Sequence, residues 1–203
     1  MGTVNEMELY DISQEVFSGR VFPGDPVPEK HTLLSMHEGA VCNLTAFQMC
    51  AHNGTHVDAP YHFYKDGETI DQVSLDRFIG YAYVAEHTGE LTAEAAERIL
   101  YAAKACQPES ADRILIKGKT TVTKEAAGVF TGEKIKLLGV ESQTVGPEDS
   151  PKEVHLIMLG AGIILLEGIN LSQVTEGAYI LNAAPINLGG SDGAPCRAIL
   201  IKW

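Results

Sequence analysis

Cysteine is scarce in this chain of 203 residues, and the four cysteines form no C-x-x-C pair: Cys42, Cys50, Cys106 and Cys196. Such scattered spacing favours buried thiols in a reducing compartment over a disulfide framework. The segment Met1–Glu6 lacks the apolar core of a signal peptide, and it has Glu6 where a myristoylation signal requires serine or threonine. We therefore expect a cytoplasmic protein.

Basic residues and long apolar runs are also few. Lysine and arginine total 15 against 27 for aspartate and glutamate, which gives a formal net charge of −12 at pH 7. A surface of that sign repels phosphate backbones and anionic membranes, and no lysine- or arginine-rich run offers a local exception. The longest apolar stretch, around residues 161–166, is too short to span a bilayer. Neither nucleic-acid binding nor membrane insertion is expected.

The composition is that of an ordinary globular protein, with 45% hydrophobic and 21% charged residues. No repeat, low-complexity segment or linker divides the chain, so we predict one domain over residues 1–203. A chain of this length builds a full core without metals or disulfides. Any bound metal would therefore serve chemistry.

Strands are predicted in seven segments: Met7–Ile12, Cys42–Ala51, Arg113–Lys117, Lys136–Val140, Ile163–Glu167, Tyr179–Leu181 and Ala198–Ile201. Helices are predicted over Ala93–Cys106, with Thr92 as N-cap, and from a capping box at Ser150–Glu153 to about Leu159. Three prolines in Val21–Pro28 predict an ordered loop or arm. The varied connections indicate an α/β domain with a mixed β-sheet and flanking helices rather than a doubly wound repeat.

Residues 52–62 contain four potential metal ligands, His52, His56, Asp58 and His62, within eleven residues. Imidazole and carboxylate groups bind zinc and manganese. The glycine, β-branched residues and proline in this segment argue against a helix, so a strand and a tight turn are expected instead. His56 and Asp58 would then point to the same side, and His52 could reach it across the turn. A lone histidine is more often structural, but this cluster predicts a metal site.

The pattern H-x-G-T-H-x-D-x-P-x-H resembles the signature of the cyclase family of metal-dependent hydrolases, which includes the bacterial kynurenine formamidases. Further stretches similar to that family occur along the chain: Tyr10-Asp11-Ile12-Ser13, Phe22-Pro23-Gly24-Asp25, His155, Gly160-Ala161-Gly162-Ile163, Leu166-Glu167-Gly168-Ile169 and Pro195-Cys196-Arg197-Ala198. The resemblance implies the family's swivelling β/β/α fold.

The resemblance also implies two divalent ions, zinc or alternatively manganese, held by five ligands: His52, His56, Asp58, His155 and Glu167. Asp58 would bridge the two ions, and His62 would act as general acid and base. The residues themselves make this plausible, because a histidine on a helix and a glutamate ending the next strand can face one pocket. Taken alone, each is more often exposed to solvent.

The implied activity is hydrolysis of a small, aryl formamide by metal-activated water. Paired ions lower the pKa of water, a cation stabilises the developing oxyanion, and His62 would protonate the leaving nitrogen. Gly189–Gly193 matches the letters G-x-S-x-G, but a turn between two strands is expected there rather than a strand-to-helix nucleophile elbow, so no serine nucleophile is expected. Two alternatives stay open: a hydrolase that opens a cyclic amide such as isatin, and a non-catalytic metal- or small-molecule-binding protein on the same scaffold.

Several other residues carry weaker expectations. Phe22 stands where the kynurenine formamidase pattern has tryptophan. Its ring could bind substrate as a pocket wall, or it could pack the segment Val21–Pro28 onto the rest of the protein. Phe47 is expected in the core, and the loop Glu141–Pro147 is expected to border the site. The segment Gly189–Gly193 predicts a turn between strands, with a structural role for Asp192. Members of the family are commonly homodimers, so a homodimer or higher homo-oligomer is expected.

Overall fold

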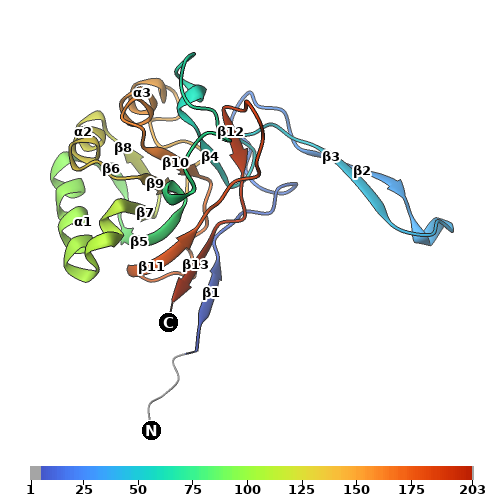
Figure 1. Ribbon diagram of the computed structural model, residues 1–203, viewed down its shortest axis with the longest axis horizontal. Helices are drawn as coiled ribbons and strands as arrows, with labels where there is room; N and C mark the ends of the chain where they lie inside the picture. Colours follow the sequence, from blue (N-terminus) through green and yellow to red (C-terminus); the bar gives the residue numbers. More distant parts are fainter. Residues whose placement is uncertain (1–5, 203) are drawn as a thin grey trace, which may run out of the picture.

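A mixed sheet forms the centre of the computed structural model, which describes residues 6–202 (Figure 1). The expectation about an amino-terminal signal rests mainly on residues 1–5, which lie outside the described residues. Within residues 6–202, nine strands pair in the order β1-β13-β11-β5-β7-β9-β10-β4-β12. Their bounds are β1 Glu8–Asp11, β4 His56–Asp58, β5 Ile79–Glu86, β7 Arg113–Lys117, β9 Leu137–Val140, β10 Ile164–Glu167, β11 Gly177–Asn182, β12 Gly193–Pro195 and β13 Ile199–Lys202. Strands β5, β7, β9 and β10 are parallel, whereas the other pairs are antiparallel. The predicted α/β architecture with a mixed sheet is confirmed.

Helices cover one face of this sheet (Figure 1). They are α1 (Ala93–Cys106), α2 (Lys124–Glu133) and α3 (Lys152–Gly160). Successive side chains of a strand point to opposite faces, so Ile114 and Ile116 of β7 join the core beneath the helices, whereas Leu115 joins the core on the other face. The centre of the sheet is therefore buried on both sides, and α3 lies over the half that contains β10 and β4.

Local signals at the helix ends were partly predictive. Thr92 caps α1 as predicted, because its side chain accepts a hydrogen bond from the amide of Ala95 at 3.3 Å. The predicted capping box at Ser150 is wrong. The Ser150 hydroxyl hydrogen-bonds to the Asp149 carboxylate instead, and Pro151 precedes α3 without a side-chain cap. Helix α2 was not predicted from the sequence.

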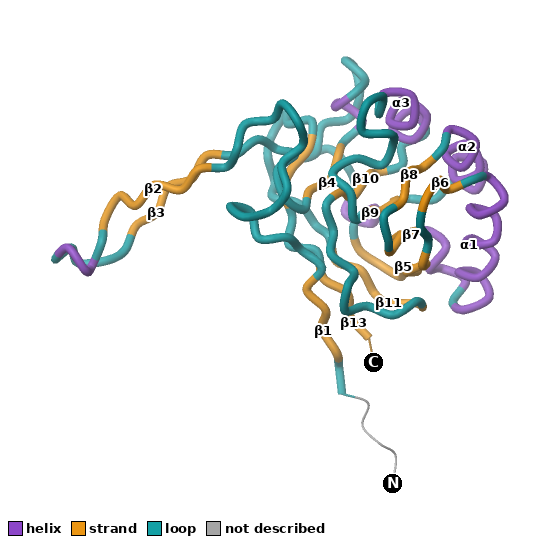
Figure 2. Tube along the Cα trace, turned by 180° about the vertical axis from the view of Figure 1, so that it is seen from behind, coloured by secondary structure: helices purple, strands orange, loops and turns teal. Residues whose placement is uncertain are grey.

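Strands β2 (Glu29–Leu34) and β3 (Leu44–Gln48) form a separate antiparallel hairpin that projects far from the body (Figures 1 and 2). A short 3-10 turn, Met36–Glu38, lies at its tip. We call residues 27–48 the arm. The predicted strand at residues 42–51 is shorter than expected and belongs to this arm. Phe47 is 58% exposed rather than in the core, because strand periodicity does not reveal whether a body lies behind the strand.

The remaining elements are short connections. Strands β6 (Gly89–Leu91) and β8 (Thr120–Val122) pair in parallel as a third sheet. The other 3-10 turns are η2 Pro60–His62, η3 Leu75–Arg77 and η4 Pro108–Asp112. None of the helices in residues 6–202 has the length and apolar character that crossing a bilayer requires.

The four cysteines, all within the described residues, are free. The expectation that they are buried is wrong: Cys42 and Cys106 are exposed, and Cys50 and Cys196 are half-buried. Cys42 lies on the projecting arm and Cys106 ends an amphipathic helix, so neither position has a core to enter.

Candidate metal centre

Strand β4 presents two of the predicted ligands on one face of the sheet. His56 and Asp58 are two residues apart, so their side chains share a face, whereas Val57 enters the opposite core. Strand β4 pairs antiparallel with β10, and the register places Glu167 directly opposite His56. The main-chain pairing of two strands thus brings Glu167 to His56 and Asp58, from which the sequence separates it by more than a hundred residues.

Helix α3 and the turn before β4 complete the cluster. His155 of α3 is 3% exposed, and its Nε2 lies 3.3 Å from Glu167 Oε1 and 3.6 Å from Asp58 Oδ2. His52 precedes β4, and its Nδ1 lies 2.8 Å from Asp58 Oδ1. Gly54 has a φ of +67°, a conformation that glycine adopts without strain, and this allows the tight turn that returns His52 to the strand.

Asp58 connects two groups of potential ligands. Its Oδ1 faces His52 and, at 3.5 Å, the Nε2 of His56, whereas its Oδ2 faces His155. One group that could hold a metal ion is His52, His56 and Asp58, and another is Asp58, His155 and Glu167. Asp58 is 1% exposed, and an unpaired carboxylate is costly at that depth. The shared carboxylate joins the two groups into one cluster.

The tautomers of two histidines test whether the cluster fits a cation. Nδ1 of His56 lies 3.0 Å from the carbonyl oxygen of Gly54, and Nδ1 of His155 lies 2.8 Å from that of Pro151. Carbonyl oxygens only accept, so both Nδ1 atoms carry hydrogen and each Nε2 is available as a ligand atom.

The spacing around those Nε2 atoms also suits a cation. They lie 3.3 to 3.6 Å from the oxygens of Asp58 and Glu167, which is longer than an ordinary N–H···O hydrogen bond. Two ligand atoms on a tetrahedral zinc, each about 2.1 Å from it, are about 3.4 Å apart. His52 differs, because its contact with Asp58 has hydrogen-bond length. The donor set and most of its spacing therefore fit a divalent cation.

The electrostatics of the cluster favour positive charge within it. Burial alone lowers the pKa of a histidine, but hydrogen bonds with Asp192 and Asp58 raise the pKa of His52 to about 11. The pKa of His155 is raised to about 10, because Asp58 and Glu167 outweigh its burial. Burial raises the pKa of Asp58, yet its histidine partners hold it well below the usual range. Protons on imidazoles balance the carboxylates, and bound cations would replace those protons.

His62 lies beside this cluster on η2. Its ring centroid is 4.1 Å from that of His52, and its Nδ1 is 3.1 Å from Asp192 Oδ2. The same oxygen of Asp192 lies 2.9 Å from His52 Nε2. Sequence reasoning gave Asp192 only a structural role, since 130 residues separate it from His62 and its glycine-rich surroundings match no ligand motif. The one signal in the sequence was that Asp192 is the acidic residue of the predicted turn Gly189–Gly193.

The remaining predicted residues lie around the cluster. The loop at residues 141–147 borders it as expected, because the amide of Val145 donates to Glu167 Oε1 at 2.8 Å. Phe22 is half-buried in a turn in which the amide of Asp25 donates to the Phe22 carbonyl oxygen. Asp25 in turn contacts the thiol of Cys50 at 3.8 Å. Among the described residues, the Phe22 ring forms no aromatic pair with the histidines of the cluster.

Comparisons with known proteins point to one family. The family model Cyclase matches residues 10–147. A kynurenine formamidase of Salinibacter ruber is 33% identical, over 96% of this chain and 97% of its own length. Another, of Paracidovorax citrulli, is 32% identical over 95% of each chain.

Solved structures share the fold. A structure described as a potential metal-dependent hydrolase with cyclase activity has a TM-score of 0.82 at 24% identity and covers 98% of this chain and 99% of its own. Isatin hydrolase A of Ralstonia solanacearum has a TM-score of 0.80 at 19% identity, over 97% of this chain and 92% of its own.

Proposed function

The chain belongs to the cyclase family, and we propose that it is a metal-dependent hydrolase that cleaves the carbon–nitrogen bond of a small aryl formamide. One observation carries the proposal: Asp58 directs one carboxylate oxygen to each of two groups of potential ligands, and His62 lies beside them. Identity of 33% to a kynurenine formamidase over nearly the whole chain supports the formamide as substrate class.

The proposed cofactor is a pair of divalent cations, zinc or alternatively manganese. His52 and His56 would hold the first cation, His155 and Glu167 the second, and Asp58 both. A bound pair of divalent cations supplies Lewis acidity, which lowers the pKa of water and polarises a carbonyl group. Imidazole and carboxylate ligands suit zinc and manganese alike, so metal analysis of the purified protein decides which of the two it uses.

His62 moves the proton in the proposed reaction. Its Nδ1 contacts Asp192, so its Nε2 is the atom that takes a proton from the attacking water and passes it to the departing nitrogen. Amide cleavage requires this delivery, because an amide anion is a poor leaving group. The side chain of His62 is 27% exposed, which leaves one side of the ring accessible to a substrate.

A substrate panel tests the proposal against its two alternatives. The purified protein would be analysed for metal and then assayed with N-formylkynurenine, formanilide and isatin. We expect turnover of the formamides to exceed that of isatin. Preferential opening of isatin would instead support the cyclic amide hydrolase, in line with the fold shared with isatin hydrolases. Bound metal without turnover of any of the three would support the binding protein.

We also propose that Phe22 contacts the substrate ring. The turn at residues 22–25 supports this role, because Asp25 in that turn contacts Cys50, two residues before His52. Phe22→Ala is expected to raise KM while leaving kcat nearly unchanged, because it removes contact made equally in ground and transition states. Tyr101→Ala serves as the control, since Tyr101 is an exposed aromatic residue on α1. Equal effects of the two substitutions on KM would contradict this role for Phe22.

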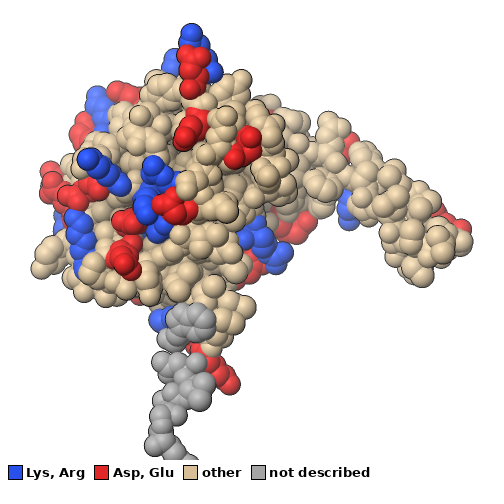
Figure 3. Space-filling model, in the orientation of Figure 1, with Lys and Arg blue, Asp and Glu red and all other residues tan. Residues whose placement is uncertain are grey.

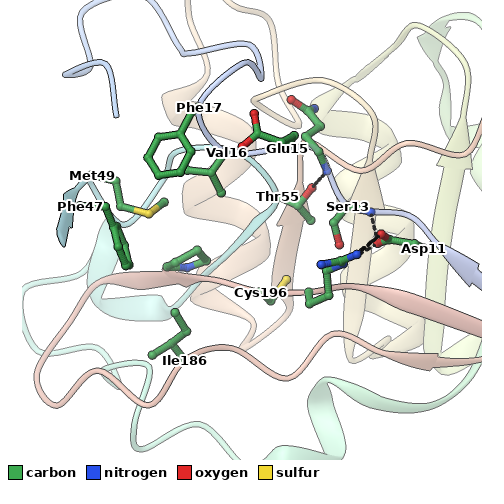
Figure 4. A pocket seen from close by; sticks show the side chains of 13 residues that line it. Asp11, Ser13, Glu15, Val16, Phe17, Phe47, Met49, Thr55, Ile186 and Cys196 are labelled. Atoms are coloured by element: carbon green, nitrogen blue, oxygen red, sulfur yellow. Dashed lines mark hydrogen bonds and ion pairs between the residues drawn. The ribbon is translucent and has the colours of Figure 1, made fainter. Parts of the chain in front are cut away.

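We propose a homodimer in which the arm of each copy packs on the body of the other. An isolated two-stranded hairpin is marginally stable in water, yet this arm exposes many apolar side chains: Val27, Leu33, Met36, Val41, Leu44 and Phe47. Figure 3 shows few charged side chains along the arm. At its base, Phe17, Phe47, Met49 and Ile186 surround an apolar groove of about 580 Å³ (Figure 4). A two-fold arrangement would cover both arms at once.

Sedimentation of wild type and Val41→Asp tests the dimer. Val41 is 93% exposed at the end of the arm, so the substitution leaves the fold of one chain intact. We expect a dimer for wild type and at least about tenfold weaker association for the variant, whereas Tyr101→Asp on α1 serves as a control for an exposed site elsewhere. A monomeric wild type at micromolar concentration would overturn the proposal.

The free cysteines support a cytoplasmic location for this enzyme.

A further inference from the structure

A single carboxylate oxygen connects the proposed metal centre to the proposed acid and base. Oδ2 of Asp192 lies 2.9 Å from His52 Nε2 and 3.1 Å from His62 Nδ1. A carboxylate at neutral pH only accepts hydrogen bonds, so both ring nitrogens donate to it.

We propose that Asp192 is a positioning residue that selects the tautomers of His52 and His62 together, an inference that rests on the proposed function. For His52, a proton held on Nε2 leaves Nδ1 as the ligand atom directed at the Asp58 side of the cluster. A carboxylate behind a metal-binding imidazole orients the ring and makes it a better ligand.

For His62, the same carboxylate holds a proton on Nδ1. Nε2 is then unprotonated and can first accept the proton of the attacking water and later deliver it to the leaving nitrogen. A hydrogen-bonded carboxylate has this function in catalytic triads, where loss of the correct histidine tautomer reduces kcat by about 10⁴-fold. The rings of His52 and His62 lie 4.1 Å apart, so one acceptor can serve both.

Main-chain contacts hold Asp192 in place although its side chain is 41% exposed. Its carbonyl oxygen accepts from the amide of Ala59 at 2.9 Å, directly after the ligand strand β4. The next residue, Gly193, begins β12 and pairs with Asp58. A Cβ on Gly193 would lie 2.8 Å from Cε1 of His52, so only glycine permits the ring to lie this close to the turn. Asp192 and Gly193 therefore both lie against the His52 ring.

Two substitutions separate hydrogen-bond acceptance from charge. Asp192→Ala removes the acceptor, whereas Asp192→Asn keeps one oxygen that can accept from both rings. Asp71→Asn is the matched control, because the Asp71 carboxylate accepts from the amide of Gly190 in the same turn and contacts neither histidine. Each variant would be made in the full chain.

Three measurements are required. Chelator competition gives zinc affinity, long-range ¹H–¹⁵N spectra of the 21.9 kDa chain report the His62 tautomer with and without zinc, and steady-state assays give kcat and KM. For Asp192→Ala we expect zinc affinity to fall about 10- to 100-fold and kcat at least about 100-fold with little change in KM. The Nδ1-protonated form of His62 should be lost. Asp192→Asn should recover part of each effect, and Asp71→Asn should match wild type.

The outcomes distinguish this inference from the proposed function. Wild-type zinc affinity and an unchanged His62 tautomer in Asp192→Ala would overturn the positioning role, even if the wild-type enzyme hydrolyses formamides. A wild-type protein without zinc binding or turnover would refute the proposed function. In that case the tautomer spectra of the metal-free protein still decide whether Asp192 selects the Nδ1-protonated form of His62.

Discussion

Zinc uptake by the metal-free protein is expected to release about two to three protons per chain at pH 8. The pKa of His52 is raised to about 11 and that of His155 to about 10, so each imidazole is about 99% protonated or more at that pH. The pKa of His56 is raised as well. Metal ligands must be deprotonated, so His52 and His155 release about one proton each, and His56 releases up to one more.

Titration calorimetry measures this number directly. Zinc would be added to the metal-free protein at pH 8 in buffers with different ionisation enthalpies, and the slope of the observed enthalpy against the ionisation enthalpy gives the protons released. His155→Ala is expected to release about one proton fewer. His31→Ala is the matched control, because His31 is exposed on the arm and should leave the slope unchanged.

Two results would refute the reasoning. Release of fewer than one proton by wild type would mean that the imidazoles are already neutral in the metal-free cluster, and that Asp58 and Glu167 do not outweigh burial. An unchanged slope for His155→Ala would mean that the released protons come from elsewhere in the protein.

Three further predictions concern the same cluster. Asp58→Asn is expected to reduce the bound cations from two to one and to abolish activity, because the asparagine side chain has one oxygen and can serve only one of the two groups of ligands. Wild-type stoichiometry by metal analysis would contradict this prediction. His62→Ala should retain both cations and lose about 10²- to 10⁴-fold in kcat, and loss of metal would make His62 a ligand instead. The raised pKa values of His52 and His155 stabilise the metal-free fold fully below pH about 6.5, and this contribution is lost as the pH rises through about 10 to 11. The urea midpoint of metal-free protein should therefore fall between pH 6.5 and 10, and a rising midpoint would show the opposite sign.

Much of the local structure follows from the sequence because it depends on neighbours along the chain. Alternation in an extended strand puts His56 and Asp58 on one face whatever the rest of the fold, and Gly54 permits the turn before them. Thr92 caps α1 for the same local reason. The alternation could not show that Phe47 lies on a projecting arm, since a strand has the same periodicity with or without a body behind it.

The second half of the candidate site depended on tertiary structure. The sequence, with its resemblance to a family, pointed to His155 and Glu167, but strand register alone puts Glu167 opposite His56, and the packing of α3 brings His155 to both carboxylates. Asp192 meets His52 across 140 residues of chain because β12 pairs with β4 at the edge of the sheet. Contacts between distant segments depend on which strands become neighbours, and that choice is made by burial of both sheet faces over the whole chain rather than by any local pattern.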